Sequence, residues 1–328
     1  FTVTGALAEA PQDVNSFFSA FIADGSTTVL LTFAVLLLTA LILLGGVRTG
    51  IERATKTLMP ALLVLLIVLA VRAMTLPGAE AGLAYYLEPD FSQLRNVNVF
   101  NSALGQAFFS LSLGMGTMIT YGSYLNKRNG IANSTMWIVL LDTSIAFLAG
   151  LIIFPAGFSI DGFDPSANGP GLIFAVLPRL FATMPGGSLF GGAFFLLLSM
   201  AAITSTISIL EVPVSHFVDR KGWSRRKAVA ITTTCAFALA IPSALGNGAV
   251  STLTTIPVLG LDFLTLMSTV WNNFALPLGG LLTAIFVGWY WKMDPALDEL
   301  CAHNAWFPAP RLWGFLIRWI CPIAITSI

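Results

Sequence analysis

The chain has little charge. Only 10% of its 328 residues are charged, and the acidic and basic residues cancel to a net charge of zero. A soluble domain carries about 25% charged residues. The scarcity excludes an ordinary soluble domain, and the even balance gives no reason to expect a nucleic acid partner.

Residues that carry out chemistry are also scarce. The three cysteines, Cys235, Cys301 and Cys321, lack the spacing of metal or redox sites. The two histidines, His216 and His303, share no motif, and the sequence contains neither HExxH nor a phosphate-binding loop. We therefore expect a protein that is not an enzyme.

Long apolar runs are abundant instead. Hydrophobic residues make up 56% of the chain, and the mean hydropathy is +0.84. Several runs reach the roughly 20 apolar residues that a helix needs to cross a bilayer. We predict an all-α polytopic membrane protein with a single transmembrane domain over residues 1–328. Its eight predicted segments lie near residues 27–46, 57–75, 98–125, 131–157, 188–218, 226–246, 260–291 and 309–328.

The basic residues predict the orientation of these segments, because Lys and Arg concentrate on the cytoplasmic side. Thirteen of the 16 basic residues fall at one set of alternating segment ends. They are Arg48, Arg53, Lys56, Lys127, Arg128, Arg220, Lys221, Arg225, Arg226, Lys227, Lys292, Arg311 and Arg318. We therefore place residues 1–25 outside, in a multi-pass protein of the plasma membrane. Because the sequence starts at Phe1 and ends in an apolar run, we expect a fragment of a longer protein.

A long Gly/Pro-rich loop, residues 158–187, is predicted on the outer side. Its stretch GPGLIFAVLPRLFATMPGG, residues 169–187, has apolar residues at helical spacing. Loops of this length are usually functional or disordered. The apolar content predicts a short helical hairpin packed as a lid over the outer face.

The segment GQAFFSLSLGMGTMITYGSY, residues 105–124, combines apolar residues with glycines and hydroxyls. Gly114 and Gly116 flank Met115, and glycine weakens a helix. We predict that the helix unwinds across residues 111–116 and frees backbone groups to bind an ion or a substrate. The alternative is that the small residues only allow close helix packing.

A second polar face lies in SMAAITSTISILEVP, residues 199–213. Ala201, Thr204, Ser205 and Ser208 follow helical spacing, so they share one face of a very apolar helix. Hydroxyl and carbonyl oxygens suit a hard monovalent cation, as they suit other hard cations. The alternative is that these hydroxyls bond back to carbonyls one turn earlier.

Three acidic residues lie in or near membrane segments, where acids are costly and usually functional. Asp142 follows WIVLL near the middle of its segment, and it is the best candidate for an ion site. Asp262 begins a segment, as a gate or as an acid favoured by the helix dipole. Glu211 precedes Val212-Pro213, and we interpret it as the partner of a basic loop residue.

These motifs resemble those of the neurotransmitter:sodium symporters, with the bacterial sodium-dependent amino acid transporters as the nearest branch. GQAFFSLSLGMGTMITYGSY is similar to the sixth transmembrane helix of that family, and AAITSTISILE to the eighth. PDFSQL, residues 89–94, is similar to the loop before the sixth helix. GIERATKTLMP is similar to the start of the fifth, with Gly50 and Pro60 in a Gly-X9-Pro spacing.

The resemblance covers the chain and implies a fold of two inverted five-helix repeats with a discontinuous helix 6. Helices 1, 2 and most of 3 would be absent here. The resemblance also implies site residues. The first sodium site would use Ser110 and Asp142. The second would use Ala201, Thr204 and Ser205, with a carbonyl from Ala201. The substrate pocket would be lined by Phe108, Phe109, Ser112, Met115, Ser205 and Ile209, with Phe109 as a lid.

Further roles follow from the same resemblance. Asp262 would be the acidic half of an outer gate, and Gly50 and Pro60 would permit unwinding on the cytoplasmic side. Gln106 occupies a position where chloride-dependent members use glutamine, so Gln106 and Asp142 form a candidate anion site. The sequence departs from chloride-dependent members at Ala146, where they carry serine. We expect Asp142 to supply the fixed negative charge and chloride not to be required.

The predicted function is therefore a sodium-coupled symporter that imports amino acids by alternating access, as a monomer or a dimer. The alternative is a non-transporting membrane protein, either a binding protein or a scaffold, derived from the same fold. A channel is disfavoured, because a pore needs a continuous polar lining and the polar patches here are local.

Overall fold

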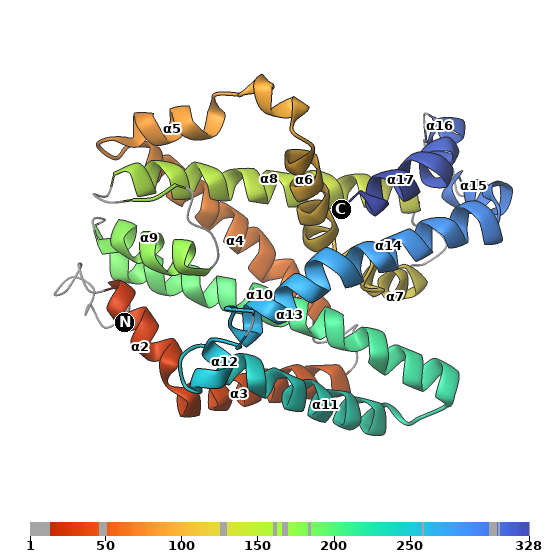
Figure 1. Cartoon of the computed structure of the whole chain (residues 1–328), viewed down its shortest axis with the longest axis horizontal. Coiled ribbons are helices and arrows are strands. Elements are labelled where there is room, and N and C mark those ends of the chain that lie inside the picture. Colours follow the sequence, from red (N-terminus) through yellow and green to blue (C-terminus); the bar gives the residue numbers. More distant parts are fainter. Residues whose placement is uncertain are drawn as a thin grey trace. The chain divides into compact units, whose positions relative to one another are not determined.

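The computed structural model describes residues 14–45, 51–124, 130–159, 163–165, 170–182, 185–257, 259–301, 307 and 309–327. Within these residues all regular structure is helical. Contacts divide the chain into two compact units, and two of the boundaries between the units fall within long helices, α8 (Ile131–Phe158) and α10 (Gly187–Lys221). Figure 1 labels the helices along the chain.

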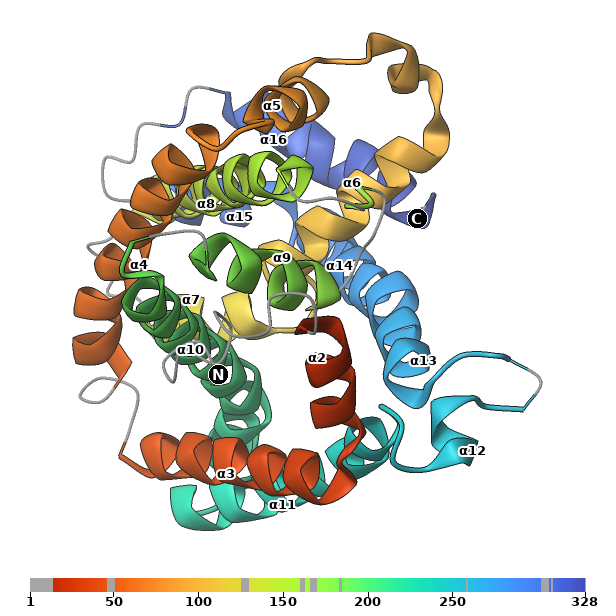
Figure 2. The same cartoon turned by 90° about the vertical axis from the view of Figure 1, so that its left-hand side faces the viewer.

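The first unit comprises residues 1–89, 144–210 and 224–263. Besides parts of α8 and α10, its helices are α2 (Val14–Ala23), α3 (Gly25–Leu44), α4 (Ile51–Met74), α5 (Ala79–Leu87), α9 (Pro170–Ala182), α11 (Arg225–Leu245) and α12 (Ser251–Thr254). Helices α3 and α11 run side by side, as Figure 2 shows. A side chain caps the N-terminus of each helix. Asp24 accepts hydrogen bonds from the Ser26 and Thr27 amides, and Ser224 accepts one from the Lys227 amide.

The core of the first unit gathers around α9. Leu177, Leu180 and Phe181 of α9 are almost fully buried against α4, α8 and α10. The rings of Phe18, Phe174 and Phe195 stack in a row, with centroids 5.4 and 5.7 Å apart, and this row links α2, α9 and α10. Within the loop 158–187, α9 is thus packed in the core of its unit, and its role as a lid over the outer face stays a prediction. The predicted hairpin is wrong for the described residues, which contain one helix there.

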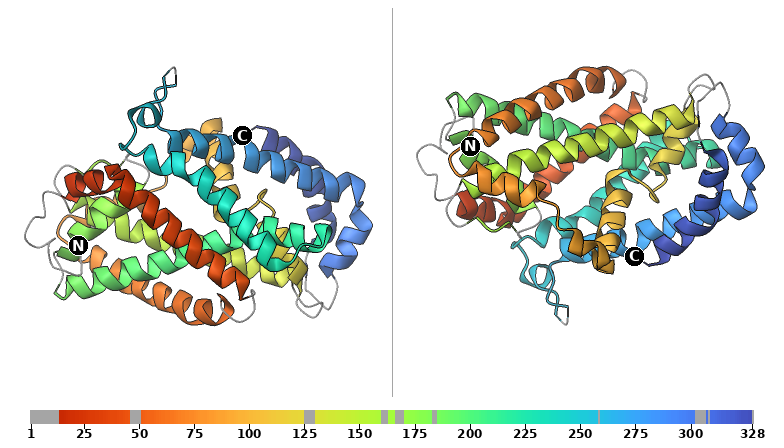
Figure 3. Two further views of the ribbon diagram at one scale, coloured as in Figure 1. Left: turned by 90° about the horizontal axis from the view of Figure 1, so that it is seen from below. Right: turned by 90° about the horizontal axis from the view of Figure 1, so that it is seen from above.

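The second unit comprises residues 90–143, 211–223 and 264–328. Its short helices are η1 (Phe91–Arg95), α6 (Val97–Ser110), α7 (Thr117–Tyr124) and α15 (Met293–Cys301). One long rod joins α13 (Phe263–Val270), η2 (Trp271–Ala275), α14 (Leu276–Ile285) and η3 (Phe286–Tyr290). A second rod joins α16 (Pro310–Phe315), η5 (Leu316–Ile320) and α17 (Cys321–Thr326). Figure 3 shows the two rods, in two shades of blue, alongside each other.

Five helical rods among the described residues are long and apolar enough to cross a membrane: 25–44, 131–158, 187–221, 225–245 and 263–290. A sixth candidate is the pair 59–74 and 79–95, which is bent by 116° at the break between its two helices. Each of these rods contains or overlaps a predicted segment. The predicted segment 98–125 is divided into α6 and α7, and the last predicted segment corresponds to the shorter rod α16–α17.

Several short elements were not predicted. Helices α2 and α5 lie outside the eight predicted segments, and α15 follows the long rod. The π-helical turns η2, η3 and η5 were not predicted either, because none of the sequence patterns that we used indicates a π-helix. Tertiary packing explains α5: Gly82 lies so close to the α8 backbone that a Cβ would meet the Phe154 carbonyl oxygen at 2.5 Å.

Candidate ion and substrate site

The predicted break in the helix is present. Helix α6 ends at Ser110 and α7 begins at Thr117, so the six residues between them are outside regular helix. Ser112, Gly114 and Gly116 have φ values of 53°, 79° and 80°. Glycine adopts such values freely, whereas Ser112 is one of only two described non-glycine residues with a positive φ. Strained backbone of this kind clusters at functional sites.

The break changes which backbone groups are paired. The Ser112 amide donates to the Phe109 carbonyl at 3.1 Å, and the Leu113 amide donates to the Phe108 carbonyl at 2.9 Å. Over the described part of the chain, the carbonyls of Leu111, Ser112 and Leu113 accept no backbone hydrogen bond. Unpaired backbone oxygens of this kind can serve as ligands where they line a cavity.

The α14 helix supports the break through glycines. A Cβ on Gly114 would meet the Leu276 carbonyl oxygen at 2.1 Å, and a Cβ on Gly279 would meet the Gly114 carbonyl oxygen at 2.1 Å. A Cβ on Gly280 would meet the Phe108 ring at 2.1 Å. The unwound stretch therefore lies against the α14 backbone, and no larger residue fits at these three positions without a shift.

At the edge of the break, Ser110 and Asp142 meet. The Ser110 hydroxyl lies 2.7 Å from both carboxylate oxygens of Asp142, to which it donates. A hydroxyl that donates its proton to a carboxylate keeps lone pairs on its oxygen, which can accept a cation. A carboxylate and a hydroxyl are the oxygen donors that hard cations prefer.

The other predicted residues near the break differ in burial. Phe108 is buried and packs on α14, whereas Phe109 is 54% exposed. Ser112 and Met115 are half-buried. Gln106 is exposed, and no hydrogen bond among the described residues joins it to Asp142. The structure thus brings together Ser110 and Asp142 of the predicted ion sites, and the anion site of Gln106 and Asp142 stays a prediction.

The hydroxyl face of α10 lies in the first unit. The Ala201 carbonyl accepts the Thr204 hydroxyl at 2.7 Å and the Ser205 hydroxyl at 3.3 Å, and the Ser208 hydroxyl donates to the Thr204 carbonyl at 2.9 Å. These are the back-bonds of the alternative that we considered. They also bring together the three oxygens of Ala201, Thr204 and Ser205 that the resemblance assigned to sodium. Ile209, on the same helix, is 54% exposed.

The remaining described site residues, Asp262 and Pro60, belong to the first unit. Asp262 is half-buried and directly precedes α13. Pro60 lies inside α4, which is helical on both sides of it. Gly50 lies outside the described residues. The proposed cytoplasmic unwinding is therefore a prediction about a second conformation.

Glu211 has a partner that the sequence did not predict. Its side chain is fully buried, and it accepts a hydrogen bond from the Tyr124 hydroxyl at 2.9 Å. Both residues belong to the second unit, with Tyr124 on α7. Our interpretation of Glu211 as the partner of a basic loop residue missed this contact, because sequence spacing does not show which helices are neighbours.

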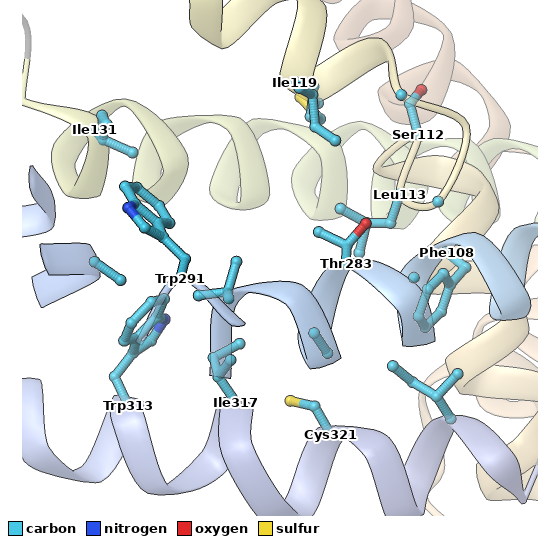
Figure 4. Close-up of a pocket in the computed structure, with 18 of the residues that line it drawn as sticks. Phe108, Ser112, Leu113, Ile119, Ile131, Thr283, Trp291, Trp313, Ile317 and Cys321 are labelled. Atoms are coloured by element: carbon cyan, nitrogen blue, oxygen red, sulfur yellow. The ribbon is translucent and has the colours of Figure 1, made fainter. Parts of the chain in front are cut away.

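A cavity of about 590 Å³ extends from the break along α14 (Figure 4). Phe108, Ser112 and Thr283 line one part of it, and Trp291 and Trp313 line another. The other labelled side chains around it are Leu113, Ile119, Ile131, Ile317 and Cys321. Sequence reasoning found Phe108 and Ser112 but not the contribution of α14 to α17, whose apolar residues carry no distinctive signal.

The fold and the break define a class of protein. Membrane transporters build ion and substrate sites at discontinuous helices, from freed backbone groups and a few side-chain oxygens. The described residues contain no group of three or more His, Cys, Asp or Glu side chains that could hold a metal. The broken helix, with its freed carbonyls and the contact of Ser110 with Asp142, fits a transporter of ions and small molecules.

Comparison with known proteins identifies the family. The family model described as the sodium:neurotransmitter symporter family matches residues 12–328. The chain is 35% identical over 329 residues to YhdH, an uncharacterized sodium-dependent transporter of Bacillus subtilis, and this match covers all of the chain and 72% of YhdH. It is 37% identical over 298 residues to an uncharacterized sodium-dependent transporter of Haemophilus influenzae, covering 90% of the chain and 64% of that protein.

The crystal structure of MhsT in complex with L-phenylalanine superposes with a TM-score of 0.90 at 41% identity, over 99% of this chain and 73% of MhsT. The chain belongs to the sodium:neurotransmitter symporter family. The predicted family and the predicted transporter fold are thus confirmed. The chain is a multi-pass membrane protein of a sodium-dependent transporter family, and the members of this family are transporters, not enzymes.

Proposed function

We propose that this chain forms most of a sodium-coupled symporter that imports an amino acid by alternating access across the plasma membrane. The observation that carries the proposal is the contact of Ser110 with both carboxylate oxygens of Asp142 beside the broken helix. The likeness to MhsT, whose structure contains L-phenylalanine, supports an amino acid as substrate.

In this proposal two sets of oxygens bind sodium. Ser110 and Asp142 contribute to the first site and bring a full negative charge. The Ala201 carbonyl with the Thr204 and Ser205 hydroxyls contributes to the second, and it is neutral. Sodium at the first site would be held next to the residues that bind substrate, since Ser110 directly precedes the unwound backbone.

The substrate would contact Phe108, Ser112 and Met115 from the broken helix, with Phe109 as a lid, and Ser205 and Ile209 from α10. The amides at the start of α7 add partial positive charge, which favours a negatively charged group. The apolar neighbours favour an amino acid with an apolar side chain, and Met115 is a flexible side chain that adapts to different shapes.

Coupling follows from the strained backbone. Ions that order residues 111–116 raise the population of the conformation that accepts substrate, and a ligand can shift this equilibrium only by its differential affinity for the two states. Asp262 would then close the outer side. Unwinding of α4 near Gly50 and Pro60 would open the cytoplasmic side.

The negative charge of Asp142 leads us to expect that transport does not require chloride. A carboxylate fixed beside the first sodium site provides the negative charge that a bound chloride would otherwise supply. We expect uptake to be the same in chloride and gluconate buffers. Uptake that requires chloride would contradict this role of Asp142 without affecting the proposed sodium coupling.

The test is uptake of radiolabelled amino acids, with L-phenylalanine first, into proteoliposomes that contain the full-length protein. We expect uptake driven by an inward sodium gradient and lost when choline replaces sodium. Sodium-dependent binding of the amino acid without uptake would support the alternative, a non-transporting binding protein. Neither binding nor uptake of any amino acid would overturn the proposed substrate class.

A further inference from the structure

An arginine and two tryptophans form a cluster on the two π-helical turns η3 and η5 of the second unit. The guanidinium carbon of Arg318 lies 4.8 Å from the ring centroid of Trp289 and 5.8 Å from that of Trp319. The two indole rings meet edge to face, with centroids 5.0 Å apart. The Trp289 indole N–H points to the Arg318 carbonyl oxygen, at 3.4 Å. None of these contacts belongs to the ion and substrate site.

Close packing of the two turns places the arginine. A Cβ on Gly288 would lie only 3.2 Å from the Arg318 Cα, so the backbones approach closely at this point. The π-helical turns interrupt the α-helical spacing, and such turns occur frequently at functional sites. The result is a guanidinium held over an indole face, where the attraction between the cation and the ring orients it.

The positive charge of this cluster is not neutralised within the described residues. Arg318 is exposed, and none of the described acidic residues forms an ion pair with it. Lys292 and Arg311, which flank the two turns in sequence, are also exposed and form no ion pair with any described residue. Glu299 on α15 lines the cavity that extends along α14, together with Val287 and Trp291. Trp289 of the cluster is not among the residues that line this cavity. The cluster is thus a cationic surface.

The candidate membrane spans indicate where the cluster lies relative to the bilayer. The rod 263–290 is a candidate membrane span, and Trp289 lies one residue before its end. Tryptophan is enriched at membrane–water interfaces, and a long arginine side chain extends its charge toward the headgroups. The distribution of basic residues assigns this end to the cytoplasmic side, whose leaflet carries the anionic lipids.

We propose that Arg318, Trp289 and Trp319 bind the headgroup of an anionic phospholipid in the cytoplasmic leaflet. The guanidinium would donate two parallel hydrogen bonds to the phosphate, a geometry that arginine offers and lysine does not. The two indoles, 48% and 47% exposed, would lie at the level of the headgroups. Their apolar faces favour a lipid over a free phosphate, since a site for a soluble anion would be lined by polar donors. This site is independent of the substrate and ions proposed above.

Native mass spectrometry of the full-length protein tests the proposal. Purified protein in detergent is titrated with phosphatidylglycerol or with phosphatidylcholine, and the fraction carrying each lipid is counted. We expect phosphatidylglycerol to bind in preference, and Arg318→Gln to lower its apparent affinity about fivefold. The matched control is Arg226→Gln, which removes an exposed charge on α11 from the same predicted membrane side, at a residue that is over no tryptophan ring in the cation–π contacts of the described residues.

Three results would overturn the proposal: equal binding of the two lipids, an equal effect of the Arg318 and Arg226 variants, or displacement of phosphatidylglycerol by millimolar inorganic phosphate. The last result would indicate a site for a free anion. If Arg318→Gln does not fold, Arg318→Lys decides the question, because it keeps the charge and removes the planar group. A weaker preference for phosphatidylglycerol in Arg318→Lys supports the site, and an unchanged preference contradicts it.

Discussion

The two candidate sodium sites of this chain obtain their oxygens in different ways. At the end of α6 the helix breaks, the backbone is strained at Ser112, and the Asp142 carboxylate adds a negative charge. On α10 the helix stays intact, and hydroxyls cluster on one carbonyl, that of Ala201. The first arrangement costs backbone strain and a charge within the membrane, whereas the second costs little.

The comparison teaches where coupling can reside. A neutral site on a regular helix changes little when its ion leaves, because the hydroxyls return to their back-bonds. A charged site beside unwound backbone can change more, because both the charge and the strain depend on the ion. We therefore expect the larger functional effects at the break, and the predictions below test that difference.

The largest effect is expected for Asp142→Ala. The substitution leaves the Ser110 hydroxyl without its partner and removes the negative charge, so sodium-driven uptake should fall roughly 10- to 100-fold. Proteoliposome uptake against sodium concentration measures it. Asp298→Ala, at an exposed acid on α15, is the control. Equal losses in both variants would remove the basis for a site at Asp142.

The next effect concerns the break itself. Gly114→Ala places a Cβ 2.1 Å from the Leu276 carbonyl oxygen at a φ of 79°, so the break must shift. We expect destabilisation of about 1–3 kcal/mol in thermal unfolding, together with lower uptake.

The matched control for Gly114 is Gly105→Ala, because a Cβ on Gly105, inside α6, meets nothing within 4 Å. Alanine should stabilise that helix by roughly 0.5–1 kcal/mol. A similar change in unfolding temperature for both variants would show that the position of the break has no special constraint.

A smaller effect is expected on α10. Ser205→Ala removes one oxygen of a neutral set, so the sodium concentration for half-maximal uptake should rise roughly two- to tenfold. Thr206→Ala is the control, since its hydroxyl bonds back to the Ala202 carbonyl in the same way but on another face of the helix. If the two variants behave alike, loss of the back-bond alone explains the result, and the second site is not on this face.

The smallest effect is expected at Asp24, whose exposed carboxylate accepts hydrogen bonds from hydroxyls as Asp142 does, but at a position with no predicted role in transport. Hydrogen bonds from the Ser26 side chain, and then from Thr27, lower the pKa of Asp24 from 3.8 to about 2. The folded pKa is lower than the unfolded one, so this contribution to stability is complete above pH 3.8 and is lost as the pH falls through about 2.

Carbon-13 NMR titration of the Asp24 carboxyl measures this pKa. Ser26→Ala should raise the pKa toward 3.8, because the largest of the stabilising hydrogen bonds is removed. The function of the protein at neutral pH should not change. An unchanged pKa in the variant would contradict the assignment of the shift to Ser26.

Much of this fold was predictable because bilayer-spanning helices have strong sequence signals. Length and apolarity located α3, α8, α10, α11 and the rod 263–290 within a few residues. The break was predictable from Gly114 and Gly116, and the spacing of Ala201, Thr204 and Ser205 predicted their shared face. These features are local, and the chemistry of a few neighbouring residues determines them.

The elements that we missed depend on contacts between distant residues. Helix α5 packs closely on α8, and where a hairpin was predicted the described residues of the loop 158–187 contain one helix, α9, whose apolar side is buried in the core of its unit. Glu211 pairs with Tyr124 across 87 positions of the sequence. Sequence spacing within one helix cannot show such partners.

The sequence by itself determined that this protein is a polytopic helical membrane protein with a weakened helix, a hydroxyl face and an acid within the membrane. Helix formation and membrane insertion depend on local apolarity and on satisfying each backbone group within its own segment. Only the tertiary structure decided that Ser110 meets Asp142, that glycines of α14 support the break, and that Arg318 lies over Trp289. Those contacts join residues far apart in sequence, and packing between helices determines them.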